Sequence, residues 1–269
     1  MKVIHHTACI GETSHIGENC RIGPYAVVED NVSIGDNTTL EAHAVIKQFT
    51  TLGKNNHIHA HAVLGDVPQD ISFHHAMKSS FVVGDNNTFR EFFNGHRSKQ
   101  EGGTTVIGSN CYFMASTHVA HDCLIGNNVI AANGCSIAGH AEVDEGVFFS
   151  ASSGVHQFCK VGAFVMVGFG SSLIVDVPPY CLVHGNPAKI FRLNLVGLRR
   201  NGFSRDALRD IERVYHLYYR SGLTKEEFLE RAGTASLAGE NAQRFVRFIR
   251  RSKRGVMGFT RRKPDDERE

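Results

Sequence analysis

An apolar residue, usually aliphatic, recurs at every sixth position over long stretches of this sequence. A period of six matches neither the 3.6-residue turn of an α-helix nor the alternation of a simple hairpin, but it suits a solenoid of short strands and tight turns. Three hexads make one triangular coil of 18 residues, so the repeat predicts an all-β solenoid, a parallel β-helix. The repeated positions are Ile4, Ile10, Ile16, Ile22, Val28, Ile34, Leu40, Ile46, Leu52, Ile58 and Leu64, then Val83 and Phe89, then Ile107, Phe113, Val119, Ile125, Ala131, Ile137, Val143, Phe149, Val155, Val161, Val167 and Leu173.

The residues beside the aliphatic position fit this interpretation. Gly, Asn and Asp cluster after it, because tight turns need backbone conformations that these residues tolerate. The fifth position of a hexad should also point inward and be small, and five cysteines occupy it: Cys20, Cys111, Cys123, Cys135 and Cys159. We interpret them as small buried hydrophobes rather than ligands or nucleophiles. The chain has 7 cysteines and no CxxC pair, which favours a reducing cytoplasm over a disulfide scaffold.

Two interruptions of the repeat predict loops. The phase slips between Leu64 and Val83, which predicts an excursion near residues 66–81. Residues 95–105 keep the phase but lose the apolar positions, which predicts a second excursion. Loops that project from a rigid scaffold are common places for binding groups. We assign residues 1–188 to the solenoid.

The character of the sequence changes beyond Pro178 and Pro179. We assign residues 189–256 to a C-terminal α-helical domain, with a helix that begins after Ser204 and another that begins at a capping box formed by Thr224 and Glu227. A third helix follows near Phe245 to Ile249, and residues 257–269 are expected to be a disordered tail.

Basic residues are concentrated in the C-terminal part. Between Lys189 and Lys263 there are 19 Lys and Arg residues against 7 Asp and Glu. This asymmetry suggests an acidic partner, for which nucleic acid, a phosphorylated metabolite and an acidic protein are open choices, or simply a solvated helical face. The N-terminus lacks the apolar stretch of a signal peptide, and no run of about 18 apolar residues occurs, so we expect neither export nor membrane insertion.

Histidines are the strongest candidates for chemistry. We interpret those of the early coils, such as His43, His57 and His59, as solvent-facing wall residues. A later group is different, because adding whole coils of 18 residues nearly superimposes His121 on His140 and His140 on His156, and stacked polar residues would line a groove. The group comprises His118, His121, Asp122, His140, His156 and Gln157.

At these residues the chain resembles the cytoplasmic acyl-carrier-protein-dependent UDP-N-acetylglucosamine O-acyltransferases of lipid A synthesis, a family within the hexapeptide-repeat acyltransferases. The resemblance covers about residues 1–255. It is most specific in His118-Val-Ala-His121-Asp122-Cys, Ala138-Gly139-His140, Val155-His156-Gln157-Phe158-Cys159, Asp176-Val-Pro-Pro-Tyr180 and Gly202-Phe-Ser204-Arg205. It implies a left-handed winding, a homotrimer in the cytoplasm, acyl carrier protein and a UDP-amino sugar as partners, and no cofactor, metal or nucleic acid.

The resemblance also assigns catalytic roles. It implies that His121 is the general base that takes a proton from the sugar hydroxyl, a role for which imidazole titrates in the right range. Asp122 is expected to orient that imidazole, and the backbone N–H of Gly139 to stabilise the oxyanion. Phe169 matches the position that closes the acyl groove. The remaining matches are expected to bind donor or acceptor: Asp70, His96, His118, His140, His156, Gln157, Asn194 and Arg200.

Three positions depart from the family pattern, and two other functions stay open. Ser72 replaces a common lysine, Val196 a common acidic residue and Asn201 a second arginine, so the acceptor sugar could differ or the protein could be a non-catalytic paralogue. A metal-dependent hydratase with the same fold would instead use three wall histidines as zinc ligands. The candidates are His118, His121 and His140.

Overall fold

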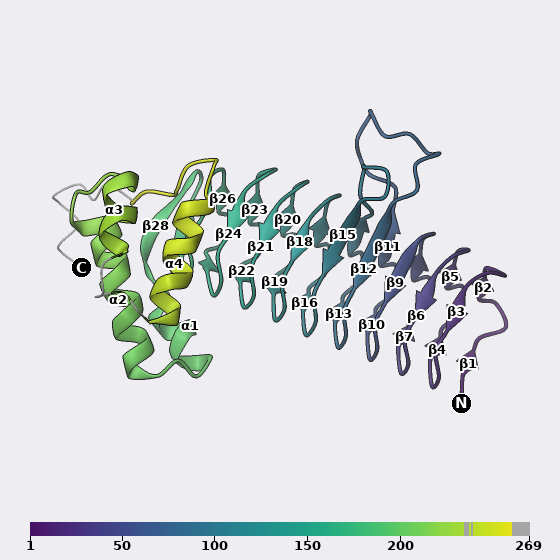
Figure 1. Ribbon diagram of the computed structural model, residues 1–269. Helices are drawn as coiled ribbons and strands as arrows, with labels where there is room; N and C mark the ends of the chain where they lie inside the picture. The colour runs from purple at the N-terminus through teal and green to yellow at the C-terminus, as the bar shows by residue number, and fades with distance from the viewer. Residues whose placement is uncertain (234–236, 238, 260–269) are drawn as a thin grey trace.

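The computed structural model describes residues 1–233, 237 and 239–259 of the chain. Short strands wind in triangular coils along a single axis, and the helices gather at the C-terminal end (Figure 1). Every strand pairs in parallel with the strand one coil away, apart from one terminal hairpin, which is antiparallel. The predicted parallel β-helix is therefore present.

The strands form three sheets, which we call A, B and C. Sheet A contains β1 (Val3–Ile4), β4 (Arg21–Ile22), β7 (Thr39–Leu40), β10 (His57–Ile58), β13 (Thr88–Phe89), β16 (Tyr112–Phe113), β19 (Ile130–Ala131), β22 (Phe148–Phe149), β25 (Met166–Val167), β27 (Cys181–Gly185) and β28 (Ala188–Leu193). Sheet B contains β2 (Cys9–Ile10), β5 (Val27–Val28), β8 (Val45–Ile46), β11 (Val63–Asp66), β14 (Asn94–His96), β17 (His118–Val119), β20 (Ser136–Ile137), β23 (Gly154–Val155) and β26 (Ser172–Leu173). Sheet C contains β3 (His15–Ile16), β6 (Ser33–Ile34), β9 (Thr50–Leu52), β12 (Ser80–Val83), β15 (Thr104–Ile107), β18 (Leu124–Ile125), β21 (Glu142–Val143) and β24 (Lys160–Val161).

The core follows from the hexad. In a typical two-residue strand the first side chain points outward and the second, at the repeated position, is buried, because successive residues of a strand face opposite sides. The five cysteines at the fifth position are between 0% and 2% exposed, which confirms that they pack as small hydrophobes. Burial raises the pKa of the Cys123 thiol to about 12, so this sulfur stays protonated at neutral pH.

The corner between sheets B and C positions the candidate site. One residue per coil there has a positive φ, between 58° and 65°, and together these residues form a column along the β-helix: Asn31, Phe49, Asp122, His140 and Phe158. The left-handed conformation turns the chain sharply, so side chains on either side of the corner can meet. The two predicted loops open near the same edge, between β11 and β12 and between β14 and β15.

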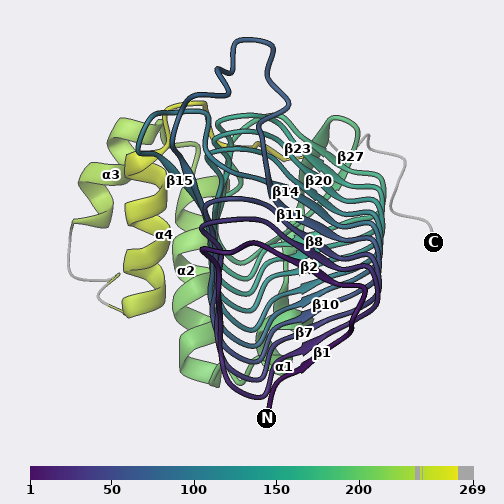
Figure 2. The same cartoon turned by 90° about the vertical axis from the view of Figure 1, so that its right-hand side faces the viewer.

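Beyond the β-helix, the described residues form four α-helices: α1 (Leu195–Arg200), α2 (Arg205–Arg220), α3 (Lys225–Ala232) and α4 (Glu240–Arg251). Ser204 caps α2 and the capping box of Thr224 and Glu227 starts α3, both as predicted. Helix α4 lies against the outer side of sheet C, where Arg244 pairs with Glu145 at 2.7 Å (Figure 2).

Two boundaries differ from expectation. Strand β28 crosses the predicted boundary at residue 188, because it pairs with β27 as a hairpin that closes the end of the β-helix. Met257 is 1% exposed and its carbonyl accepts a hydrogen bond from the Tyr219 hydroxyl at 2.7 Å, so the predicted disorder does not extend to this residue. The rest of the predicted tail, residues 260–269, lies outside the described residues.

Candidate active site

His121 and Asp122 meet within one chain. The Nδ1 of His121 lies 2.8 Å from Oδ2 of Asp122, and both side chains are largely buried, at 13% and 10% exposure. Adjacent residues of a straight strand would point to opposite faces, but Asp122 has φ +60° and leaves the strand at the corner. The corner therefore brings together two side chains that the strand geometry would separate.

Asp122 is held from three sides. Ser98, fully buried in the second loop, donates its hydroxyl to Oδ1, and the backbone N–H of Lys99 donates to Oδ2 at 3.1 Å. The Asp122 N–H donates in turn to Thr105 Oγ1 at 2.7 Å. Burial works to raise the pKa of Asp122, but the hydrogen bonds from Ser98, His121 and Lys99 outweigh it and leave the pKa lowered. The carboxylate is thus charged at neutral pH and fixes the proton of His121 on Nδ1.

Gly139 lies directly against the His121 ring. It is 18 residues beyond His121, one full coil along, and a Cβ placed on it would stand 2.7 Å from His121 Cε1 and 2.9 Å from Nε2. Within the part of the chain that the structure describes, the Gly139 N–H donates to no protein acceptor. A free N–H beside an imidazole Nε2 is the arrangement that a base and an oxyanion donor need.

The other histidines do not fall one full coil apart: His140 is one residue beyond the position that stacks on His121, and His156 is two residues before the position that stacks on His140. Asp122, His140 and Phe158 share a column, and the His140 and Phe158 rings stack with centroids 4.5 Å apart. The rings of His121 and His140 nevertheless meet edge to face at 5.2 Å. His156 does not stack on His140 and instead contacts Arg254 Nη2 through Nδ1 at 3.0 Å. Gln157 is exposed beside it.

Two further predicted histidines line the outer side of sheet B. His118 points outward from β17 and shares a hydrogen bond with Asn94, while His96 Nδ1 donates to the Val67 carbonyl at 2.5 Å. Burial lowers the pKa of His118 to about 4, with the nearby His96 and His121 adding to the effect. His118 is therefore a neutral hydrogen-bonding group at neutral pH.

Asp70 reaches the same edge from the first loop. Its carboxylate accepts hydrogen bonds from the Ser72 hydroxyl at 2.6 Å and from Lys99 Nζ at 2.7 Å. The bond from Lys99, together with those from Ser72, holds the pKa of Asp70 well below its usual range. Ser72 stands where a lysine was expected from the family pattern. Lys99 of the second loop contacts the same Asp70 carboxylate as Ser72 and so supplies a positive charge there.

Other predicted residues lie apart from this cluster. Asn194 caps α1 by accepting from the Gly197 N–H at 3.1 Å, and Arg200 is exposed at the end of that helix. Across the described residues, no contact joins either to His121. Phe169 is 68% exposed on the corner between sheets A and B.

Sequence reasoning missed Ser98, Lys99, Asn94 and Arg254. Ser98 and Lys99 lie in a loop without periodicity, and nothing in their spacing from Asp122 signals contact. Asn94 could have been found, because it lies in register with His118 one coil away. Its amide oxygen accepts a hydrogen bond from His118 Nδ1.

The hydratase alternative receives less support. At this corner, the groups close enough to share one ion are His121, Asp122 and His140, whereas the alternative named His118 in place of Asp122. His118 Nδ1 is already engaged by Asn94. The carboxylate and the free Gly139 N–H also suit proton transfer better than zinc ligation.

Among the described residues, no helix is long and apolar enough to cross a bilayer. A coiled platform with a histidine–carboxylate pair beside a free backbone N–H defines a hexapeptide-repeat acyltransferase. Residues 13–48, 31–66 and 104–139 match the bacterial transferase hexapeptide family (six repeats), and residues 176–257 match domain 2 of UDP N-acetylglucosamine O-acyltransferase.

Relatives of known name extend the match to the full length. The acyl-[acyl-carrier-protein]--UDP-N-acetylglucosamine O-acyltransferase of Thiobacillus denitrificans is 42% identical over 96% of this chain and 100% of the relative. The protein of that name from Anaeromyxobacter dehalogenans is 44% identical over 94% of this chain and 98% of its own. The structure of the Francisella novicida UDP-N-acetylglucosamine acyltransferase matches with a TM-score of 0.91 at 35% identity over 98% of this chain and 95% of its own.

The chain therefore belongs to the UDP-N-acetylglucosamine O-acyltransferase family. Its fold, a left-handed parallel β-helix with C-terminal helices, is the one that the sequence predicted.

Removing the Ser98 hydroxyl should weaken catalysis without unfolding the protein. A hydrogen bond to a charged group contributes about 1.5–3 kcal/mol, so Ser98→Ala should lower kcat by roughly tenfold. Because the Ser98 hydroxyl holds Asp122 in place against His121, its loss should lower kcat and leave KM for both substrates little changed. Ser153→Ala, at another buried serine, is the matched control. An unchanged kcat, or an equal loss in Ser153→Ala, would exclude a positioning role for Ser98.

Proposed function

We infer that this protein transfers an acyl chain from acyl carrier protein to the 3-position of a UDP-N-acetylglucosamine-type sugar, the first step of lipid A synthesis. The observation that carries the inference is the His121–Asp122 pair beside the free Gly139 N–H, on the scaffold of a family whose members bear this activity in their names. Purified protein should transfer (R)-3-hydroxyacyl groups from a panel of acyl carrier protein thioesters, offered with UDP-N-acetylglucosamine and its 3-amino analogue. Failure with both acceptors would favour the non-catalytic alternative.

The proposed mechanism follows from the proton on His121. Asp122 keeps that proton on Nδ1, so the Nε2 lone pair is free to accept the proton of the sugar 3-hydroxyl. As that proton leaves, the hydroxyl oxygen bonds to the thioester carbon, and the Gly139 N–H donates to the resulting oxyanion. Collapse of the intermediate breaks the C–S bond, and the departing thiolate takes the proton back from Nε2. No cofactor is required.

We place the acceptor between two subunits. Asp70, His96, His118 and Lys99 lie near the His121 corner, whereas Asn194 and Arg200 lie on the C-terminal side of the chain, without contact to it among the described residues. A neighbouring subunit could bring its own Asn194 and Arg200 to the His121 corner, where the guanidinium would bind the diphosphate. His140, His156 and Gln157 line the donor side of the same groove.

A homotrimer fits the distribution of apolar surface. Helix α4 lies against the outer side of sheet C (Figure 2). The outward side chains of the C-terminal half of sheet A are apolar at Ile130, Phe148 and Met166. Sheet B presents small side chains at Ser136 and Gly154. Packing sheet A of one chain on sheet B of the next closes a three-membered ring. The seven free cysteines suit a cytoplasmic location.

The basic residues of α4 are the proposed docking surface for acyl carrier protein. Arg244 and Arg251 already pair with Glu145 and Asp144 of the β-helix, whereas Arg247 and Arg250 are exposed. Charge reversal at Arg247 and Arg250 should raise the KM for the protein donor several-fold, with an effect that shrinks in added salt, and leave the affinity for the UDP-sugar unchanged. The same reversal at Arg205 and Arg209 of α2 controls for net charge. If the KM for the protein donor is unaltered, α4 is not the docking surface for acyl carrier protein.

Phe169 is the proposed end of the acyl groove. The outward positions of sheet B run His118, Ser136, Gly154 and Ser172 in register, so small side chains extend three coil spacings, or about 14 Å, from His118 toward the corner that carries Phe169. Each methylene excluded from the groove loses about 0.8 kcal/mol of burial, so the wild type should prefer short or medium chains.

Phe169→Gly should shift the preference toward longer acyl chains in competition assays with mixed donors. Phe92→Gly, at an exposed phenylalanine on the same corner but on the opposite side of His118, is the control. A wild type that already prefers the longest donors, together with a Phe169→Gly profile that does not move, would remove Phe169 from the groove.

A further inference from the structure

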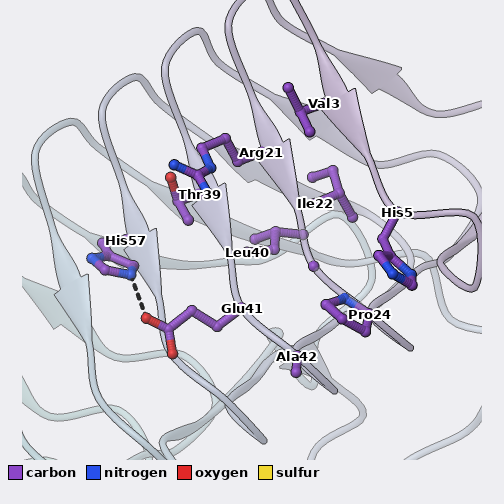
Figure 3. Close-up of a pocket in the computed structure, with 11 residues that line it drawn as sticks. Val3, His5, Arg21, Ile22, Pro24, Thr39, Leu40, Glu41, Ala42 and His57 are labelled. Atoms are coloured by element: carbon purple, nitrogen blue, oxygen red, sulfur yellow. Dashed lines mark hydrogen bonds and ion pairs between the residues drawn. The ribbon is translucent and has the colours of Figure 1, made fainter.

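Three side chains converge on the outer side of sheet A, far from the His121 corner. His57 points outward from β10, and Glu41 follows β7 one coil away (Figure 3). His59 follows β10 in the chain. His57 Nε2 lies 2.7 Å and His59 Nδ1 3.2 Å from the same Glu41 oxygen, Oε1. The two imidazole rings stack with centroids 4.1 Å apart. Two nitrogens and one carboxylate oxygen thus already face a common point.

We propose that Glu41, His57 and His59 bind a divalent transition-metal ion, with Zn²⁺ as the best-suited ion. Their ligand atoms all lie within 4.8 Å of one another, and rotations of the side chains would open the space for one ion between them. Two imidazoles and one carboxylate are a common zinc ligand set, completed in a tetrahedron by a fourth ligand. Glu91, whose Oε1 is 3.6 Å from His59 Nδ1, or a water molecule can take that position.

The charges around the three ligands suit a cation. Arg90 acts on His59, but its guanidinium is held by Glu91 at 3.0 Å and by the Tyr112 hydroxyl at 3.1 Å. The permanently charged side chains that act on His59 are Glu41, Glu91 and Arg90, which together carry a net negative charge.

The position of the cluster leaves it accessible. His57 and Glu41 side chains are 43% and 37% exposed and line a surface depression with Arg21 and Thr39 (Figure 3). This is the polar N-terminal half of sheet A, distinct from the apolar C-terminal half proposed for subunit packing. The site is also separate from the proposed catalytic groups, so its occupancy can be tested without an acyl transfer assay.

Titration calorimetry of the full-length protein with ZnCl₂ would test the proposal, with Co²⁺ absorption as a check on ligand type. Wild type should bind one Zn²⁺ per chain at this site with a Kd near or below about 10 μM, and Zn²⁺ should raise its Tm. The double variant His57→Gln/His59→Gln should lose that binding event, and Glu41→Gln should weaken it about tenfold or more.

Two controls separate this site from other histidines. His61→Gln removes an exposed ring from the same coil as His57 and His59, where it stacks on His43 of the preceding coil. His140→Gln removes a histidine of the catalytic cluster. Both should keep the binding event. A wild-type Kd above about 1 mM, or equal binding by the double variant, by Glu41→Gln and by wild type, would overturn the proposal. Loss of the event in His140→Gln with retention in the double variant would assign the ion to the catalytic cluster instead.

Discussion

His121→Ala is expected to fold and assemble like the wild type but to lose at least about 100-fold in kcat, the scale of a missing general base. An alcohol is too weak an acid to attack a thioester unaided, and the variant removes the imidazole that takes its proton. The His121 ring lies outside the hydrophobic core, so the core of the β-helix should be unaffected. Steady-state kinetics, circular dichroism and light scattering would measure the three properties.

The control for His121 is another histidine on a corner. His43→Ala removes a ring at a positive-φ position between sheets A and B, where it stacks on Tyr25 and His61. Its turnover should match the wild type. If His121→Ala also retains nearly full turnover, His121 is a wall residue and the proposed mechanism is wrong.

Gly139→Ala is expected to remain folded and yet lose kcat by about 100-fold or more, the size of effect seen when an oxyanion donor is displaced. The added methyl would lie 2.7 Å from His121 Cε1 and 2.9 Å from Nε2, closer than carbon contacts allow. The ring can relieve this clash only by moving away from Asp122 and from the reacting oxygen. The methyl group would also crowd the approach of an oxyanion to the Gly139 N–H.

Gly154→Ala provides a matched comparison. Gly154 lies on the same side of the β-helix, but a Cβ there would meet only the Ser136 carbonyl oxygen at 3.9 Å. This variant should be stable and should keep its base-dependent rate, apart from any change in acyl-chain preference. If Gly139→Ala is as active as Gly154→Ala, the close approach of His121 to Gly139 has no part in catalysis.

The sequence by itself determined the scaffold. The hexad specifies which residues are buried, because a two-residue strand between tight turns leaves room for one large inward side chain, and the narrow interior demands small residues such as Cys123 beside it. Helix starts were equally local, since Ser204 and Thr224 cap the turn that follows them in the chain. Such features depend on neighbours within a few residues, which a pattern records directly.

The sequence identified the residues of the candidate site but not how their side chains contact one another. The residues His121, Asp122 and Gly139 were recognised by family motifs, while the pairing of His121 with Asp122 stayed open because strand alternation argues against it. Only the positive φ at the corner reverses that expectation. The stack of His121 on His140 was displaced by one residue, since a coil repeats after 18 positions and that count places Gly139 under His121.

Contacts between distant segments were decided only by the tertiary structure. Ser98 and Lys99 reach Asp122 because an aperiodic loop folds back over the corner, and no spacing rule predicts where such a loop returns. The tertiary structure also brings Glu41 beside His57 and His59. The repeat alone identified these two histidines only as solvent-facing wall residues. A repeat determines which side chains point inward and which point outward along the coil. The conformation of a loop and the rotamer of a side chain depend instead on packing against residues that are far apart in sequence.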